Sequence, residues 1–215
     1  VRPDRLIREP RETRSATYVV RALAGDLPDL PSWGAQRVTR LDGASARVDV
    51  DLSRPGDAVG PAERDAWLAS SVMLDATDPQ VVELAKRAAA ELRGALLDDP
   101  REVARACRRF AHSYIEKKSL GVGFATAGEV ARTAQGDCTE HAVLLAAILR
   151  ARGIPSRVVS GLIYVDEFVG ERAVFGFHMW TQALVPDEQG VERWMDLDAT
   201  LPGLADFDAA HIGVA

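Results

Sequence analysis

The chain has 215 residues, enough for one large domain or for one domain with a small appendage. Hydrophobic residues make up 47% of it and charged residues 27%, as in an ordinary globular protein. With a net charge of −6 and no long basic run, nucleic-acid binding is not implied, and no apolar stretch approaches the roughly 18 residues that span a bilayer. The chain begins with Val1 rather than Met, and we interpret it as a fragment or a processed form.

The first segment, residues 1–60, is predicted to be a small β appendage. Residues 46–52 alternate apolar and polar side chains, which is the period of a half-buried strand. A turn at 41–45 joins them to a second short stretch, so residues 36–52 are predicted to form a hairpin. A linker with Pro and Gly over 53–60 ends the appendage, and residues 61–215 are predicted to form the main domain.

Helical patterns begin after residue 60. Asp78 and Pro79 are typical of a helix start, with Asp78 as the N-cap. A second helix is predicted to start near Asp99, with an apolar stripe formed by Val103, Cys107, Phe110 and Tyr114. Glycine-rich residues 120–124 break that helix, and a short helix is predicted over 127–132.

The two cysteines have different surroundings. Cys107 lies within a helical stripe and is interpreted as a small buried hydrophobic residue. Cys138 follows Gly136 and Asp137, which permit a close backbone approach and an N-cap, and Glu140 completes a capping box. Two cysteines cannot form a disulfide framework in a domain of this size, so the redox compartment stays open.

Cys138 is therefore predicted to occupy the first position of a helix. The helix has a buried apolar stripe (Leu144, Leu145, Ile148 and Leu149) and ends at Gly153 and Pro155. A helix N-terminus favours a thiolate over a thiol, and its N–H groups can stabilise the oxyanion of a tetrahedral intermediate. We interpret Cys138 as a candidate nucleophile. The alternative is a buried small residue, for which a glycine-flanked helix start is a poor place.

Three strands are predicted after this helix, over 157–165, 175–185 and 191–197. In the second strand the odd-numbered apolar residues share one face, so His178 and Trp180 project to the other. If residues 186–190 form a five-residue loop, Val185 pairs with Val191 and His178 lies directly opposite Asp198. Asp196 is the competing carboxylate, on the same face but nearer the turn.

Each of these residues has a simpler reading. A strand histidine is commonly a structural residue, and an aspartate before Ala-Thr at a strand end is usually a turn former. The combination is more informative: a nucleophile at a helix start, followed by a hairpin that carries a base and its orienting carboxylate. This order has the logic of a Cys-His-Asp triad.

Three ordered motifs resemble the transglutaminase-like superfamily. The first is Gly136 to His141, which opens a helix ending in Arg-Ala-Arg-Gly-Ile-Pro-Ser-Arg at 150–157. The others are Phe-His-Met-Trp at 177–180 and the segment from Trp194 to Thr200. The resemblance covers about residues 65–205, with Ala199 in place of the family's usual proline. It implies an α+β fold with a papain-like core, in which a Cys-bearing helix packs on an antiparallel sheet.

The resemblance also implies roles for individual residues. Cys138 becomes the nucleophile, His178 the base and Asp198, rather than Asp196, the orienting group. Family members often carry an aromatic residue ahead of the Cys helix that helps to stabilise the oxyanion. The corresponding region is 114–118, where no second donor is assigned, so the Cys138 N–H is the oxyanion donor expected here.

The expected function is a cysteine-dependent hydrolase or transferase of amide or peptide acyl groups, which acts on a peptide or protein substrate through a thioester on Cys138. No cofactor, metal, nucleic acid or membrane span is expected. Cross-linking activity is disfavoured, because no calcium-loop spacing is present. The alternatives are a non-catalytic peptide-binding module with the same fold, and a zinc site built from Cys138, His141, His178 and Asp198.

Overall fold

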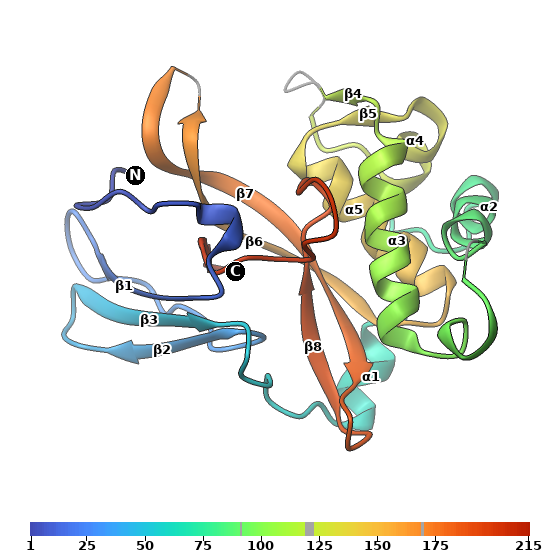
Figure 1. The fold of residues 1–215 in the computed structure, drawn as a ribbon, viewed down its shortest axis with the longest axis horizontal. Helices are drawn as coiled ribbons and strands as arrows, with labels where there is room; N and C mark the ends of the chain where they lie inside the picture. The colour runs from blue at the N-terminus through green and yellow to red at the C-terminus, as the bar shows by residue number, and fades with distance from the viewer. Residues whose placement is uncertain (91, 119–122, 169) are drawn as a thin grey trace. The chain divides into compact units, whose positions relative to one another are not determined.

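The computed structural model of the protein describes residues 1–90, 92–118, 123–168 and 170–215. The chain forms two compact units (Figure 1). The first contains residues 1–57, 159–178 and 207–215, and the second contains residues 58–158 and 179–206. Within the described residues, none of the helices is both long and apolar enough to cross a membrane.

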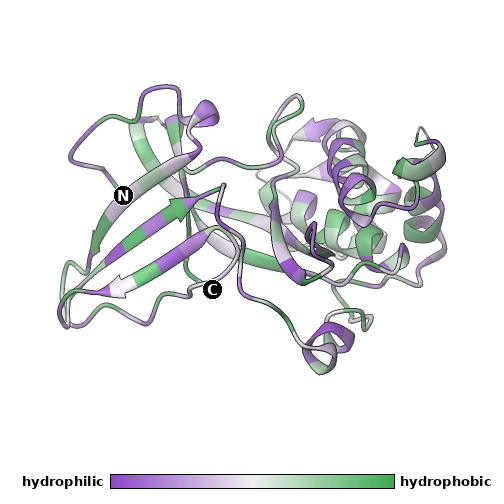
Figure 2. Ribbon diagram, turned by 60° about the horizontal axis from the view of Figure 1, so that its bottom comes forward, coloured by the Kyte–Doolittle hydropathy of each residue, from purple (hydrophilic) through white to green (hydrophobic). Residues whose placement is uncertain are grey.

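The first unit contains a three-stranded antiparallel sheet with the order β1-β3-β2. Its strands are β1 (Ser15–Arg21), β2 (Gln36–Arg40) and β3 (Ser45–Asp51), preceded by the short helix η1 (Pro10–Glu12). The pairing of β2 with β3 confirms the hairpin predicted over 36–52. Hydropathy alternates along these strands (Figure 2), because one face packs on a core that includes Val48, Val50 and Phe175.

The helices belong to the second unit. They are α1 (Pro61–Ala66), α2 (Pro79–Ala88), η2 (Gly94–Leu96), α3 (Pro100–Tyr114), α4 (Ala127–Thr133) and α5 (Cys138–Ala151). Asp78 and Asp99 cap α2 and α3 as predicted. Two very short parallel strands, β4 (Lys117–Lys118) and β5 (Gln135–Gly136), pair just before α5. Of the break predicted over 120–124, residues 120–122 lie outside the described residues.

A four-stranded sheet has the order β8-β7-β6-β9. Its strands are β6 (Ser156–Phe168), β7 (Glu171–Pro186), β8 (Glu192–Leu197) and β9 (His211–Gly213). The β7–β8 and β6–β9 pairs are antiparallel. Strands β6 and β7 each contribute residues to both units. The mixture of helices and antiparallel strands confirms the α+β fold class.

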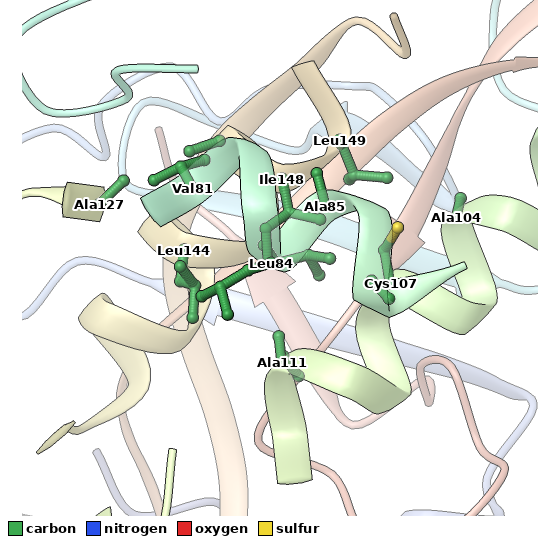
Figure 3. Packing of buried hydrophobic residues seen from close by; sticks show 14 of the residues in the cluster. Val81, Leu84, Ala85, Ala104, Cys107, Ala111, Ala127, Leu144, Ile148 and Leu149 are labelled. Atoms are coloured by element: carbon green, nitrogen blue, oxygen red, sulfur yellow. The ribbon is translucent and has the colours of Figure 1, made fainter. Parts of the chain in front are cut away.

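Helix α5 is the centre of the second unit's core. Leu144, Leu145, Ile148 and Leu149 are each 0% exposed, which confirms the predicted stripe. Residues on its other faces are buried too, so the helix is covered by α2, α3 and α4 as well as by the sheet. Figure 3 shows Leu144, Ile148 and Leu149 packed with residues of α2 and α3.

Hydrogen bonds fasten α5 to the strands of its own unit. The Thr181 hydroxyl on β7 donates to the carbonyl of Ala142, at 2.9 Å. At the other end of the helix, the buried Arg150 guanidinium donates to the carbonyl of Ser156, where β6 starts. The Ser156 hydroxyl in turn donates to the Ala146 carbonyl. The Cys-bearing helix is thus held against the antiparallel sheet along its length.

The start of α5 is fixed by the fully buried side chain of Glu140. One of its carboxylate oxygens accepts the N–H of Asp137 at 3.0 Å, which completes the capping box, and the other accepts the N–H of Ala125 at 3.1 Å. A Cβ atom on Gly136 would lie 2.1 Å from the Cβ of Glu140. Glycine is therefore required at position 136 to let the chain approach the helix.

Replacement of Gly136 tests this constraint. We expect Gly136→Ala to lower the free energy of unfolding by about 1–3 kcal/mol, because the added methyl group must displace the buried Glu140 side chain. Gly123→Ala is a matched control, since a Cβ there has no atom of a described residue, apart from its chain neighbours, within 4 Å, and it should change stability little. Urea unfolding followed by circular dichroism measures both. Equal stability of the two variants would contradict the proposed packing.

Candidate active site

Cys138 is the first residue of α5 and is half-buried, with a free thiol. Cys107 is also a free thiol, so the two cysteines form no disulfide, but its surroundings are different. It is completely buried between α2 and α3 (Figure 3), and burial raises the pKa of its thiol to about 12. Cys107 is thus the buried hydrophobic residue predicted from the sequence, and Cys138 is the thiol that reagents can reach.

Among the contacts of the described residues, the N–H of Cys138 is the group of this turn that suits an oxyanion. The first N–H groups of a helix have no acceptor within the helix. The side chain of Asp137 accepts the N–H of Thr139 at 2.9 Å, and the Asp137 carbonyl accepts the N–H of His141 at 3.1 Å. The N–H of Cys138 itself therefore remains the best candidate for binding a developing negative oxygen.

Tyr114 occupies the region where the family resemblance suggests an aromatic oxyanion donor. Its ring stacks on Phe110 with a centroid distance of 5.7 Å, and its hydroxyl donates to the carbonyl of Ala131 on α4. This hydrogen bond from the Tyr114 hydroxyl joins α3 to α4. Tyr114 is thus placed as a structural residue rather than as a second oxyanion donor.

Asp198 follows β8 directly and is 0% exposed. Its Oδ1 accepts both the N–H and the hydroxyl of Thr200, each at 2.7 Å. The turn-forming role of Asp198 is therefore present in the structure. It also has a consequence for chemistry, because two hydrogen bonds to one oxygen fix the plane and direction of the carboxylate.

Helix α3 holds the segment that contains Asp198. The guanidinium of Arg108 donates to the carbonyls of Asp198, Leu201 and Gly203, and its Nε lies 3.5 Å from a carboxylate oxygen of Asp206. A ring nitrogen of His112 lies 2.9 Å from the carbonyl of Ala199. These contacts go to backbone carbonyls or to Asp206, which lies in the loop after β8. Helix α3 therefore fixes the path of the chain around Asp198.

The side chain of Arg108 is completely buried, which is unusual for an arginine. Burial lowers its pKa, and the negative charge of Asp206 opposes that effect. The carbonyl acceptors and Asp206 together stabilise the buried cation. Residues 105, 108 and 112 recur at helical spacing on one side of α3, so a polar stripe lies beside the apolar one and could have indicated this contact from the sequence.

Asp196, the competing carboxylate, has its own partners. Its Oδ1 accepts the indole N–H of Trp180 at 2.9 Å and the amide of Gln182 at 2.7 Å. The amide oxygen of Gln182 accepts from Arg157, whose guanidinium lies 4.2 Å from the ring centroid of Trp194. Asp196 is therefore part of a structural network across β7 and β8.

The predicted register of the β7–β8 hairpin is wrong by two residues. Val185 pairs with Arg193, not Val191, and the last pair is Thr181 with Leu197. Pro186 continues the strand and the loop comprises 187–191, closed by the hydrogen bond from the N–H of Asp187 to the carbonyl of Val191. Continued by one residue, this register places Trp180, rather than His178, opposite Asp198.

His178 lies on β7 and belongs to the first unit, whereas Cys138 and Asp198 belong to the second. The histidine is 7% exposed, while the preceding Phe177 is 82% exposed. This opposite burial confirms that the two side chains project to different faces of the strand. The His178 ring has a second imidazole as a neighbour in its own unit, that of His211, with the ring centroids 5.5 Å apart.

A zinc site based on Cys138 and His141 is not assembled. A ring nitrogen of His141, Nδ1, lies 2.6 Å from the carbonyl of Asp137. In the part of the chain that the structure describes, no group of three ligating side chains with ligand atoms within 4.8 Å of one another includes either residue. His141 instead packs, almost fully buried, against the first turn of its own helix.

Comparison with known proteins matches residues 86–199 to the family model described as the transglutaminase-like superfamily. A protein of Mycobacterium tuberculosis without an assigned function is 26% identical over 159 residues. That match includes 71% of this chain and 50% of the relative, so the chain spans about half the length of the curated relatives it matches.

Two solved structures share the fold. The periplasmic domain of TgpA from Pseudomonas aeruginosa, bound to ethylmercury, has a TM-score of 0.56 at 19% identity, over 91% of this chain and 74% of that one. A candidate cysteine protease from Cytophaga hutchinsonii has a TM-score of 0.55 at 14% identity, over 94% and 76%. These structures confirm the predicted transglutaminase-like fold. With more than half of its residues matched by the family model, this chain belongs to the transglutaminase-like superfamily, whose members are cysteine-dependent peptidases or transferases.

Proposed function

We propose that the protein is a cysteine-dependent hydrolase or transferase of amide or peptide acyl groups, with Cys138 as nucleophile, His178 as base and Asp198 as the orienting carboxylate. His178 takes the thiol proton, and the sulfur attacks the carbonyl carbon while the Cys138 N–H binds the oxyanion. The tetrahedral intermediate expels the amine, which takes the proton from His178, and leaves a thioester. Water or a second amine then resolves the thioester.

The observation that carries this proposal is the accessible Cys138 thiol at the start of a helix whose first turn is rigidly capped. A helix N-terminus provides both partial positive charge and N–H donors at the point where the sulfur must attack. The other thiol of the chain, Cys107, lies in the core with a raised pKa. The chain thus contains one cysteine in a position to act as a nucleophile.

His178 and Asp198 are assigned from the strands that carry them. His178 lies two residues before Trp180 on β7, so the two side chains project to the same face of that strand. Asp198 directly follows β8, which pairs with β7 as far as Thr181 and Leu197. Asp198, rather than Asp196, is assigned because it matches the aspartate of the family's motif in the segment from Trp194 to Thr200, while Asp196 takes part in the hairpin network with Trp180 and Gln182.

The proposal includes the division of the chain and the class of substrate. Residues 61–215 would form the catalytic domain and residues 1–60 a β appendage. A peptide or protein substrate follows from the amide chemistry of the family. A non-catalytic binding module remains the alternative, and it predicts that Cys138→Ala keeps the protein's effect in the cell, whereas an enzyme would lose it.

Alkylation tests the difference between the two thiols. With iodoacetamide at neutral pH, we expect Cys138 to be carboxamidomethylated and Cys107 to remain unmodified, as determined by peptide mass spectrometry. We expect His178→Ala to slow the reaction of Cys138 markedly, because the imidazole no longer accepts the thiol proton. Cys107→Ala is the control and should leave the rate unchanged. A native Cys138 that reacts no faster than the same cysteine in denatured protein would contradict an activated thiol.

A competition experiment separates hydrolysis from transfer. The protein is incubated with an activated acyl ester, with and without a fluorescent primary amine, and both acid and amide products are quantified. Hydrolysis predicts acid at an unchanged rate, whereas transfer predicts that amide replaces acid as the amine concentration rises. Both products should be lost in Cys138→Ala, because both reactions pass through the same thioester.

Substitution of Arg108 tests the support of Asp198. We expect Arg108→Met to lower the free energy of unfolding by on the order of 3 kcal/mol, because it leaves the carbonyls of Asp198, Leu201 and Gly203 without their donor, two of them in buried contacts. Activity should fall further than unfolding accounts for, since the Asp198 carboxylate is no longer fixed. Arg109→Met, the neighbour with no comparable contacts in the described part of the chain, is the matched control. Full activity in folded Arg108→Met would contradict this role.

A further inference from the structure

The first unit contains a buried polar cluster that the proposed mechanism does not use. His211 is the first residue of β9 and is 1% exposed, with a carboxylate oxygen of Asp208 2.9 Å from its Nδ1. Asp208 is equally buried. A histidine and an aspartate buried together form a charged or strongly polar pair. Burying such a pair costs desolvation free energy unless its polar atoms are hydrogen-bonded.

The Asp208 carboxylate is held from several directions. The guanidinium of Arg11 lies 3.0 Å from its Oδ2, and the N–H of Ala210 donates to its Oδ1 at 2.9 Å. Burial raises the pKa of Tyr18, and the nearby negative charge of Asp208 raises it further, while Arg11 opposes the shift. The carboxylate of Asp208 therefore acts as an acceptor toward its neighbours, and its backbone carbonyl, which can only accept, also lies 3.1 Å from Nδ1 of His211.

This arrangement determines the state of the His211 ring. Because Asp208 accepts, Nδ1 of His211 must carry the proton, which leaves Nε2 as the acceptor in the neutral ring. The ring of Phe207 covers His211 at a centroid distance of 4.2 Å and an interplanar angle of 30°. The orientation and the tautomer of His211 are thus both fixed by its neighbours in the first unit.

The imidazole ring of His178 lies beside that of His211. Their ring centroids are 5.5 Å apart with an interplanar angle of 50°, and a ring nitrogen of each lies within 4.8 Å of one on the other. His178 is itself only 7% exposed, so both rings are buried. We propose that His211, fixed by Asp208, is a positioning residue that holds the His178 imidazole in one orientation and one tautomer. The consequence of this positioning for catalysis rests on the function proposed above, in which His178 is the base.

The inference has a direct spectroscopic test, because nitrogen chemical shifts distinguish the two tautomers of a neutral histidine. The full chain is labelled with nitrogen-15 at its four histidines, and each resonance is assigned by single replacement. In the unaltered protein we expect His211 to be protonated on Nδ1 and His178 to populate a single tautomer. A spectrum in which His211 is protonated on Nε2 would overturn the proposal without any variant.

Two variants extend the test to catalysis. In Asp208→Asn and His211→Gln, we expect the His178 resonances to move to the average of two tautomers and kcat to fall by about 10-fold to 100-fold, with KM changed less than about twofold. Asp49→Asn, which removes a surface ion pair with Arg47 in the same unit, is the matched control and should change neither quantity. Unchanged His178 resonances in a folded variant would overturn the proposal. If Cys138→Ala retains activity, the proposed function fails, but the His178 resonances still decide whether His211 positions that ring.

Discussion

The buried carboxylate of Glu140 is the constraint on which the Cys138 region depends. It accepts one N–H from the residue that caps α5 and a second from Ala125, so the segment before α4 and the start of α5 are tied to a single side chain. The same side chain excludes any residue other than glycine at position 136. The start of the helix that carries Cys138 is therefore fixed by a single buried carboxylate.

The chain around Asp198 is also held by a buried ionic side chain, but here that side chain is a cation instead of a carboxylate. A buried cation, Arg108, gathers the carbonyl groups of the loop after β8, and Thr200 fixes the carboxylate itself. In both places a buried ionic side chain binds backbone groups, and Arg108 is also paired with the carboxylate of Asp206. This arrangement fixes the path of the chain on either side of Cys138 and around Asp198. Such rigidity suits a reaction in which a small displacement of one group is expensive.

Local signals in the sequence were sufficient for the helices. The capping residues at 78, 99 and 137 and the glycine at 153 act within one turn of the chain, so they predict boundaries without knowledge of the fold. The hairpin register was not predictable in this way, because Pro186 extends β7 instead of starting the loop. The Arg108 and His211 contacts were missed for another reason. Arg108 binds carbonyls more than 90 residues away in the sequence. His211 reaches its position in the first unit only when β9 pairs with β6, which short-range patterns around Asp208 and His211 do not indicate.

The distribution of tryptophan gives the molecule a built-in optical reporter. Of its four indoles, three lie in the second unit, at positions 67, 180 and 194. Trp67 and Trp194 meet edge to face beside the Arg157 cation, and the indole N–H of Trp180 is bound to a carboxylate. Trp180 directly precedes Thr181, whose partner across the hairpin, Leu197, is the residue before Asp198. Emission from this residue should therefore respond when charge or solvent changes beside Asp198, so that turnover can be followed in real time without an attached dye.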